Sequence, residues 1–274
     1  MIGTTSYGFR YLLLDPRQAP PLAAVVDETR ALGLEGLQVC ENARPLDLTL
    51  PQWKSLLARA RDIGLEIHLG CMTLTPDMLD RYLERAAAIP DDTLRIVLEE
   101  DAPPTRDEIA AFLDTAVVKL ERAGMRIAIE NHFHIPCRTL AETVSAYPVE
   151  RVAFCLDSAN SLRSFESIGQ VWALLAPRAC MYHLKDYHVT GSNVGFAVSG
   201  APLGTGDMDV SGFLDSIFAR DPQPAIYLEN WVPCSGDCET DIAADREWLR
   251  QSFANIKTMV AARRVPQSTE GKCL

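Results

Sequence analysis

The sequence predicts a single-domain (β/α)₈ TIM barrel, a fold of the α/β class. Eight short apolar runs alternate with longer amphipathic segments along almost the whole chain, and parallel strands that are covered on both faces are expected to be apolar throughout. The length of 274 residues suits this fold, which typically takes about 250 residues. Because no linker-like stretch interrupts the series, we expect a catalytic barrel over residues 1–262 and a polar tail over 263–274.

The predicted strands are runs of four or five residues, most of them almost entirely apolar. They are Ile2–Ser6, Gly36–Val39, Glu66–Leu69, Leu94–Leu98, Arg126–Ile129, Val152–Leu156, Cys180–Leu184 and Ala225–Leu228. A doubly wound open sheet is the alternative arrangement. It would require a G-x-G-x-x-G turn after the first strand, and the segment from Gly3 to Gly8 lacks that spacing.

The segments between the strands have helical periodicity and helix-end signals. Apolar residues recur at helical spacing in two of them, at Trp53, Leu56, Leu57, Ala60 and Ile63, and at Ile109, Phe112, Leu113, Ala116, Val117 and Leu120. The predicted helix starts are Thr75 before Pro76 and the capping-box spacings Thr105–Glu108 and Thr139–Glu142. The predicted helix ends are the glycines Gly33, Gly64 and Gly124.

The composition excludes several classes of protein. Lys and Arg number 26 against 37 Asp and Glu, which gives a net charge of −11, and such a charge repels nucleic acid. No signal peptide and no apolar stretch of about 20 residues is visible. We therefore expect a cytoplasmic protein with no nucleic-acid or membrane partner. Its eight cysteines are expected to be free, because several lie in apolar runs.

Four consecutive predicted strands each deliver one metal-binding type of side chain. Glu130, Asp157 and Glu229 directly follow the fifth, sixth and eighth strands, and His183 lies in the seventh. The active site of a parallel barrel lies at the carboxyl ends of its strands. Any one of these residues could instead cap a helix or form an ion pair, but three carboxylates at one mouth would repel each other without a cation. We expect one divalent metal ion, with Mn²⁺ ahead of Mg²⁺, Co²⁺ or Zn²⁺.

Four further residues are candidates for binding a small carbohydrate or sugar-acid substrate. Arg10 and Lys185 could orient a carboxylate or phosphate, although each could equally be a structural ion-pair partner. His132 follows the fifth strand, and Asn160 lies three residues after Asp157.

The sequence resembles the xylose-isomerase-like barrel superfamily of sugar isomerases and epimerases, which includes D-tagatose 3-epimerase, inosose isomerases and dehydratases, and 3-dehydroshikimate dehydratase. The resemblance covers most of the chain and rests on Ile129-Glu130-Asn131, Leu156-Asp157-Ser158-Ala159-Asn160, His183-Leu184-Lys185-Asp186, Pro202–Asp207 and Leu228-Glu229. It implies that the Glu, Asp, His and Glu positions bind the metal and that Glu130 and Glu229 act as acid and base. Sugar epimerases commonly carry His where this chain has Asn160.

These features predict a divalent-metal-dependent isomerase or epimerase of a small sugar, keto-sugar or polyol ketone, acting through a metal-stabilised enediolate. The alternative is a lyase on the same scaffold, a decarboxylase or dehydratase of an oxidised sugar acid. A repair endonuclease would need several zinc ions and a basic surface, which five histidines and a charge of −11 oppose. The substrate and the choice between a monomer and a homo-oligomer are left open by the sequence.

Overall fold

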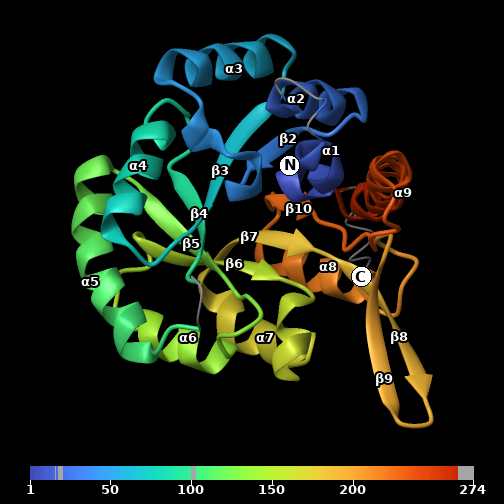
Figure 1. Ribbon diagram of the computed structural model, residues 1–274. Coiled ribbons are helices and arrows are strands. Elements are labelled where there is room, and N and C mark those ends of the chain that lie inside the picture. Colours follow the sequence, from blue (N-terminus) through green and yellow to red (C-terminus); the bar gives the residue numbers. More distant parts are fainter. Residues whose placement is uncertain (16, 18–20, 100–102, 265–274) are drawn as a thin grey trace, which may run out of the picture.

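Eight parallel strands close into a barrel in the computed structural model, which describes residues 1–15, 17, 21–99 and 103–264 (Figure 1). Around the barrel the strands follow the order β1-β10-β7-β6-β5-β4-β3-β2, and every neighbouring pair is parallel. The strands are β1 (Ile2–Thr5), β2 (Gly36–Val39), β3 (Glu66–Met72), β4 (Thr93–Val97), β5 (Arg126–Glu130), β6 (Val152–Asp157), β7 (Ala179–Leu184) and β10 (Ile226–Leu228). The predicted barrel is therefore confirmed.

All eight predicted strands occur, and their ends differ from the prediction by at most three residues. The largest difference is in β3, which continues past Leu69 to Met72 because it stays paired with β4 as far as the Met72–Val97 pair. Gly70 lies in this added stretch, where an added Cβ would press on Cys40 and Arg95. The absence of a side chain at residue 70 thus leaves room for Arg95 inside the barrel.

Helices surround the barrel on the outside (Figure 1). They are α1 (Arg10–Leu14), α2 (Pro21–Ala31), α3 (Leu50–Asp62), α4 (Pro76–Ala86), α5 (Arg106–Ala123), α6 (Cys137–Val144), α7 (Ile168–Leu175), α8 (Val210–Arg220) and α9 (Cys238–Arg264). Short 3-10 turns are η1 (Ser6–Phe9), η2 (Glu41–Ala43), η3 (Pro45–Asp47), η4 (Asn160–Ser164) and η5 (Ala176–Arg178). The predicted apolar stripes of α3 and α5 face the strands, with Trp53 and Ile109 fully buried.

Most of the predicted helix ends are confirmed. Thr105 and Glu108 form a complete capping box, and α4 begins at Pro76, although Thr75 makes no side-chain cap bond. The predicted stop glycines all have positive φ: 89° at Gly33, 70° at Gly64 and 68° at Gly124.

The capping box predicted at Thr139 is wrong. Helix α6 begins two residues earlier, at Cys137, so that Thr139 lies inside its first turn. The helix can start there because Pro136 takes the N-cap position and the Glu166 carboxylate accepts a hydrogen bond from the Cys137 backbone N–H. A carboxylate from elsewhere in the chain thus replaces the local cap.

The hydrophobic core has two parts. The larger part fills the space between the strands and the surrounding helices. The smaller part lies inside the barrel and consists of Ala128, Cys155, Met181 and Tyr227. Each of these residues lies two positions before Glu130, Asp157, His183 or Glu229 on the same strand or at its end, and residues two apart in a strand point to the same side. The inner cluster is therefore the floor of the site.

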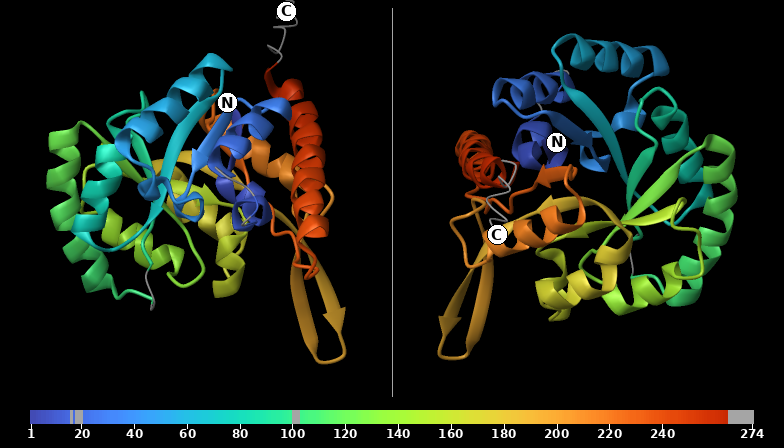
Figure 2. Two further views of the ribbon diagram at one scale, coloured as in Figure 1. Left: turned by 45° about the horizontal axis from the view of Figure 1, so that its top comes forward. Right: turned by 180° about the vertical axis from the view of Figure 1, so that it is seen from behind.

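An antiparallel hairpin that the sequence did not predict projects from the barrel. Its strands are β8 (Asp186–Ser192) and β9 (Gly195–Ala201), inserted between β7 and α8 (Figures 1 and 2). At its root the Asp186 carboxylate accepts hydrogen bonds from the backbone N–H groups of Gly204, Gly206 and Met208. The turn before α8 thus fixes the base of the hairpin.

The last described helix, α9, contacts the first helical segments of the chain. This helix packs against η1, α1 and α8 (Figure 2) and reaches Arg264, two residues past the predicted end of the barrel. The rest of the predicted tail, 265–274, lies outside the described residues. Among the described helices none is long and apolar enough to cross a membrane. The seven cysteines in the described ranges are free thiols.

Candidate functional site

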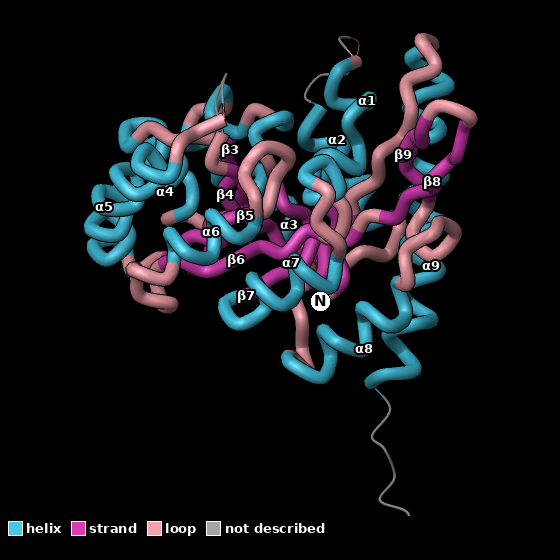
Figure 3. The backbone as a smooth tube through the Cα atoms, turned by 90° about the horizontal axis from the view of Figure 1, so that it is seen from below, coloured by secondary structure: helices cyan, strands magenta, loops and turns pink. Residues whose placement is uncertain are grey.

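The four predicted metal ligands meet inside the carboxyl end of the barrel. Glu130 and Asp157 are the last residues of β5 and β6, Glu229 directly follows β10, and His183 is the penultimate residue of β7. Asp157 and His183 are partners in the register of β6 and β7, whose strands run side by side (Figure 3). All four are buried. Strand closure therefore brings together residues up to 99 positions apart in the chain.

Two of the carboxylates approach the same nitrogen of the His183 imidazole. Its Nδ1 is 3.1 Å from Glu130 Oε2 and 3.4 Å from Glu229 Oε2. Its Nε2 is 2.9 Å from Oε1 of Gln38, a fully buried side chain on β2. The amide oxygen of Gln38 thus receives the Nε2 proton and leaves Nδ1 directed at the carboxylates. Gln38 was missed by the sequence analysis.

The Lys185 ammonium lies within the same cluster. Its Nζ is 2.8 Å from Glu229 Oε1, 2.9 Å from Asp157 Oδ2 and 2.9 Å from Asn160 Oδ1. It also lies 5.4 Å from the centre of the Trp231 ring. Two of the predicted substrate-binding residues, Lys185 and Asn160, are therefore in direct contact with the predicted ligands.

Arg95 is a second buried cation, which the sequence analysis did not identify. It lies on β4, and its Nε donates to Glu130 Oε2 at 2.6 Å. Its Nη1 donates to Glu41 and to the Cys71 carbonyl. A charged residue inside an otherwise apolar predicted strand was the available signal, because a buried arginine requires a partner.

Asn160 holds Glu130 from the other side. Its Nδ2 donates to Glu130 Oε1 at 2.8 Å, so that both oxygens of Glu130 accept from side chains. Asn160 is itself fixed, because its backbone N–H donates to Asp157 Oδ1 at 2.7 Å. Asn160 and Arg95 together therefore immobilise the Glu130 carboxylate.

Burial and the two cations together set the charges of the site. Burial opposes ionisation of Glu130, but Arg95 and His183 outweigh it and hold the pKa of this carboxyl well below its usual range. Burial likewise opposes ionisation of Glu229, whose pKa is lowered chiefly by Lys185. Burial raises the pKa of Asp157 despite the neighbouring Lys185. Arg95 and Lys185 thus offset the negative charge that the three carboxylates concentrate in the site.

The donor set fits a divalent ion. Asp157 Oδ2 and His183 Nδ1 are buried atoms without a well-formed hydrogen bond, although Lys185 Nζ and Glu130 approach them as ion-pair partners. Three carboxylates and one imidazole suit Mn²⁺, Mg²⁺, Co²⁺ or Zn²⁺. Donor atoms of Glu130, Cys155 and His183 also lie within 4.8 Å of one another. Cys155 belongs to the inner cluster that forms the floor of the site.

The other two predicted substrate-binding residues lie outside this cluster. Arg10 lines a cavity of about 480 Å³ at the mouth, together with Phe133, Trp231 and Val198 of the hairpin. A neighbouring cavity of about 260 Å³ reaches Asn160 and is also lined by Phe133, Trp231 and Val198. The His132 ring instead pairs with Glu99, 2.9 Å away. Arg10 therefore lies at a cavity that the hairpin also lines, whereas His132 is held by Glu99.

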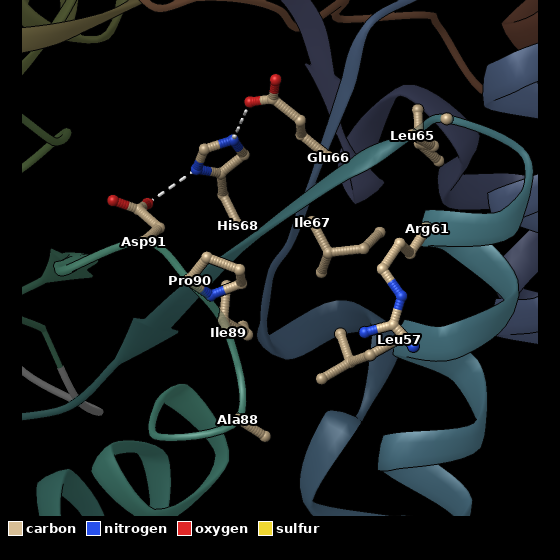
Figure 4. Close-up of a pocket in the computed structure, with 11 residues that line it drawn as sticks. Leu57, Arg61, Leu65, Glu66, Ile67, His68, Ala88, Ile89, Pro90 and Asp91 are labelled. Atoms are coloured by element: carbon tan, nitrogen blue, oxygen red, sulfur yellow. Dashed lines mark hydrogen bonds and ion pairs between the residues drawn. The ribbon is translucent and has the colours of Figure 1, made fainter.

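A larger cavity of about 690 Å³ lies at the opposite, amino-terminal end of the barrel (Figure 4). There His68 lies between Asp91, at 2.6 Å from its Nδ1, and Glu66, at 3.6 Å from its Nε2. The cavity lies between the end of α3, the start of β3 and the loop before β4. The predicted ligands lie at the other end of the strands, where the active site of a parallel barrel is expected.

The fold and the sequence define the family. Residues 26–252 match the xylose isomerase-like TIM barrel family, and the chain belongs to it. The expected superfamily is thereby confirmed.

Two of three similar proteins are named for an activity. The chain is 28% identical over 262 residues to a 3-oxo-isoapionate decarboxylase from Pectobacterium atrosepticum, covering 94% of this chain and 95% of the relative. A D-psicose 3-epimerase structure aligns with a TM-score of 0.72 and 14% identity, covering 94% and 99% of the two chains. A structure of the IOLI protein with a bound zinc atom aligns with a TM-score of 0.67 and 15% identity, covering 96% and 98%. The fold thus carries sugar-modifying enzymes of several reaction classes.

Proposed function

We propose that this protein is a metal-dependent carbon–carbon lyase that decarboxylates a small 3-oxo sugar acid. The proposal rests mainly on the immobilised side chain of Glu130. Its two carboxylate oxygens accept hydrogen bonds from Asn160 and Arg95. Epimerisation and isomerisation require a carboxylate that takes a proton from carbon. Decarboxylation of a 3-oxo acid removes no proton from carbon, so it tolerates a carboxylate held in this way.

The proposed ligands are Glu130, Asp157, His183 and Glu229. When bound there, a divalent ion supplies Lewis-acid polarisation of the substrate carbonyl. The bond between the carboxylate carbon and its neighbour breaks, its electron pair moves toward the 3-oxo group, and CO₂ leaves. One proton then adds to the carbon that lost CO₂.

Lys185 has two roles in this scheme. Its buried ammonium offers positive charge to the 3-oxo oxygen as negative charge develops there, in a site that requires no reorganisation. The ammonium also donates the proton that the carbon receives, and it regains a proton from solvent water. Arg10, at the entrance, is the proposed contact for a polar group at the distal end of the substrate.

The 28% identical decarboxylase supports the lyase, because the two chains align over nearly their whole lengths. The isomerase or epimerase remains the second candidate. It is favoured by the presence of two carboxylates, Glu130 and Glu229, which both approach His183 Nδ1 and would act as base and acid.

The test is a mass balance on purified protein supplied with Mn²⁺, Mg²⁺, Co²⁺ or Zn²⁺. A panel of 3-oxo sugar acids and a panel of ketoses are incubated in ordinary water and in D₂O. Release of CO₂ and a product lighter by that mass, with solvent deuterium at the new C–H bond, is expected from the acids. A product of unchanged mass from the ketoses, without CO₂ release from any acid, would overturn the proposal in favour of the epimerase.

Lys185 provides the matched variant. Lys185→Gln keeps a polar side chain but removes the charge, and the loss of one electrostatic contact in the transition state lowers kcat by about 10²–10³-fold. Decarboxylation at the wild-type rate in Lys185→Gln would exclude the assigned role.

A further inference from the structure

The cavity of about 690 Å³ at the amino-terminal end of the barrel lies where two strands have not yet paired (Figure 4). Strand β3 begins at Glu66, but its pairing with β4 begins only at Leu69 and Leu94. The first three residues of β3 therefore precede the pairing, and the loop before β4 lines the cavity with them. The volume lies within the range of small-molecule sites, about 300–1,000 Å³.

Most of the cavity lining is apolar. Two groups of side chains face each other across it (Figure 4). One group comes from α3 and the start of β3, and the other comes from the loop before β4: Leu57, Leu65 and Ile67, and Ala88, Ile89 and Pro90. Two facing apolar walls favour a ligand whose body is apolar, such as an aromatic ring.

His68 supplies an unused hydrogen-bond acceptor at one end of the cavity. Its Nδ1 is 2.6 Å from Asp91 Oδ2, and its ring makes a T-shaped contact with the Tyr227 ring, with the centroids 5.6 Å apart. Burial opposes ionisation of Asp91, but the hydrogen bonds from His68 and from the Thr93 backbone N–H outweigh it and lower the pKa of this carboxyl. The ionised Asp91 accepts the Nδ1 proton, and this tautomer leaves a lone pair on Nε2. Among the described residues, this buried Nε2 has no hydrogen-bond partner.

The groups around His68 restrict what can bind there. Glu66 Oε2 lies 3.6 Å from Nε2, too far for a hydrogen bond. Glu66 and Asp91 therefore lie at different nitrogens of the ring, so that one metal ion could not bind the histidine and both carboxylates. The two carboxylates also repel an anionic ligand group. A neutral hydroxyl suits this end, because it can donate its proton to Nε2.

Arg61 supplies a positive charge at the other side of the cavity. It lies in the last turn of α3, and Figure 4 shows it on the opposite side of Ile67 from His68. In the part of the chain that the structure describes, its guanidinium takes part in no hydrogen bond or ion pair. A guanidinium binds a carboxylate through two parallel hydrogen bonds. This side of the cavity therefore suits a carboxylate.

We propose that this cavity is a second small-molecule site, which binds an aromatic hydroxy acid with one phenolic hydroxyl and one carboxylate. The hydroxyl donates to His68 Nε2, the ring packs between Ile67 and Pro90, and the carboxylate pairs with Arg61. A dicarboxylate or a phosphate ester of the hydroxyl is excluded, because its second negative charge would meet the carboxylates beside His68. The proposal does not depend on the reaction at the metal site.

The test is isothermal titration calorimetry of the purified protein with 3-(4-hydroxyphenyl)propanoate. We expect saturable binding of one molecule per chain, with a Kd of about 1 mM or below. Two analogues separate the polar contacts: 3-phenylpropanoate lacks the hydroxyl, and 3-(4-hydroxyphenyl)propanamide lacks the charge. Each is expected to bind about 10-fold more weakly, because each loses one hydrogen-bonded contact. Failure of the hydroxy acid to bind, or an analogue that binds equally tightly, would overturn the proposal.

Variants of the cavity locate the bound probe. Arg61→Gln removes the charge and is expected to weaken binding about 10-fold. The matched control is Lys54→Gln, which removes an exposed charge from the same helix outside the cavity and should bind like the wild type. Ala88→Trp fills the cavity and should abolish binding, with circular dichroism like that of the wild type.

Each variant also gives a result that would contradict the proposal. Binding that is unchanged in Arg61→Gln or in Ala88→Trp would place the probe elsewhere on the protein, for example at the mouth of the barrel. An equal loss in Lys54→Gln and Arg61→Gln would show that only the general charge of the surface matters. Because the predicted metal ligands lie at the other end of the strands, all three variants should bind Mn²⁺ like the wild type, whether or not the protein is a decarboxylase.

Discussion

Replacing Gln38 tests how the site orients its histidine. Gln38→Met keeps the length of the side chain but removes the oxygen that lies 2.9 Å from His183 Nε2. Because both groups are fully buried, the Nε2 proton would lose its partner, at a cost of about 1–3 kcal/mol. Loss of a partner that orients a metal-ligating histidine typically weakens metal binding about 10–100-fold. We expect a rise in the metal dissociation constant within that range.

The assay is competition for Mn²⁺ or Zn²⁺ against a fluorescent chelator, so that it does not depend on knowing the substrate. Gln38→Glu is the control, since it retains an acceptor oxygen at the same position and should bind metal far more tightly than Gln38→Met. Equal metal affinity in Gln38→Met and wild type would refute the orienting role. Equal losses in both variants would instead attribute the effect to packing.

The remaining predictions concern charge and metal. Arg95→Met should lower the free energy of unfolding by about 3–5 kcal/mol in denaturant titrations, because Glu130 keeps a buried charge without its partner; an unchanged midpoint would contradict this. Burial raises the pKa of Asp245 from 3.8 to about 7, although the hydrogen bond from the Tyr11 backbone N–H acts in the opposite direction. As pH rises, the Asp245 carboxyl ionises in the unfolded chain before it ionises in the folded protein. The free energy of unfolding therefore falls between about pH 4 and pH 7, by up to about 4 kcal/mol. Asp245→Asn should therefore raise Tm at pH 8 and leave it nearly unchanged at pH 4. Removing metal with a chelator should abolish activity while circular dichroism still reports a folded barrel, because the apolar core does not depend on the ion; chelator-induced unfolding would show that the ion is structural.

The positions of the predicted ligands could be inferred from the sequence, because each barrel strand is marked by a short local run of apolar residues. An apolar run buried on both faces predicts the strand, and the polar residue that ends it predicts the site. Glu130, Asp157 and Glu229 could be assigned in this way without knowing how the strands were arranged. The start of α5 was also predictable, because its cap, Thr105, is next to the helix in the sequence. The start of α6 at Cys137 was not, because its capping carboxylate comes from Glu166, 29 residues away.

Only the tertiary structure revealed what surrounds those ligands. Gln38 and Arg95 lie within predicted strands, and nothing local shows whether such a side chain points into the barrel or toward the helices. Closure of the barrel decides this, and it brings Arg95 to Glu130 across 35 positions of sequence. The hairpin was missed for a related reason. Its strands are exposed and mix glycine, serine and apolar residues, so they lack the continuous apolar run by which the eight barrel strands were found. The sequence by itself therefore determined the barrel and the places of its polar strand ends, since both follow from local burial. The charge balance at Glu130 and the projecting arm depend on contacts between distant segments, which only the folded chain creates.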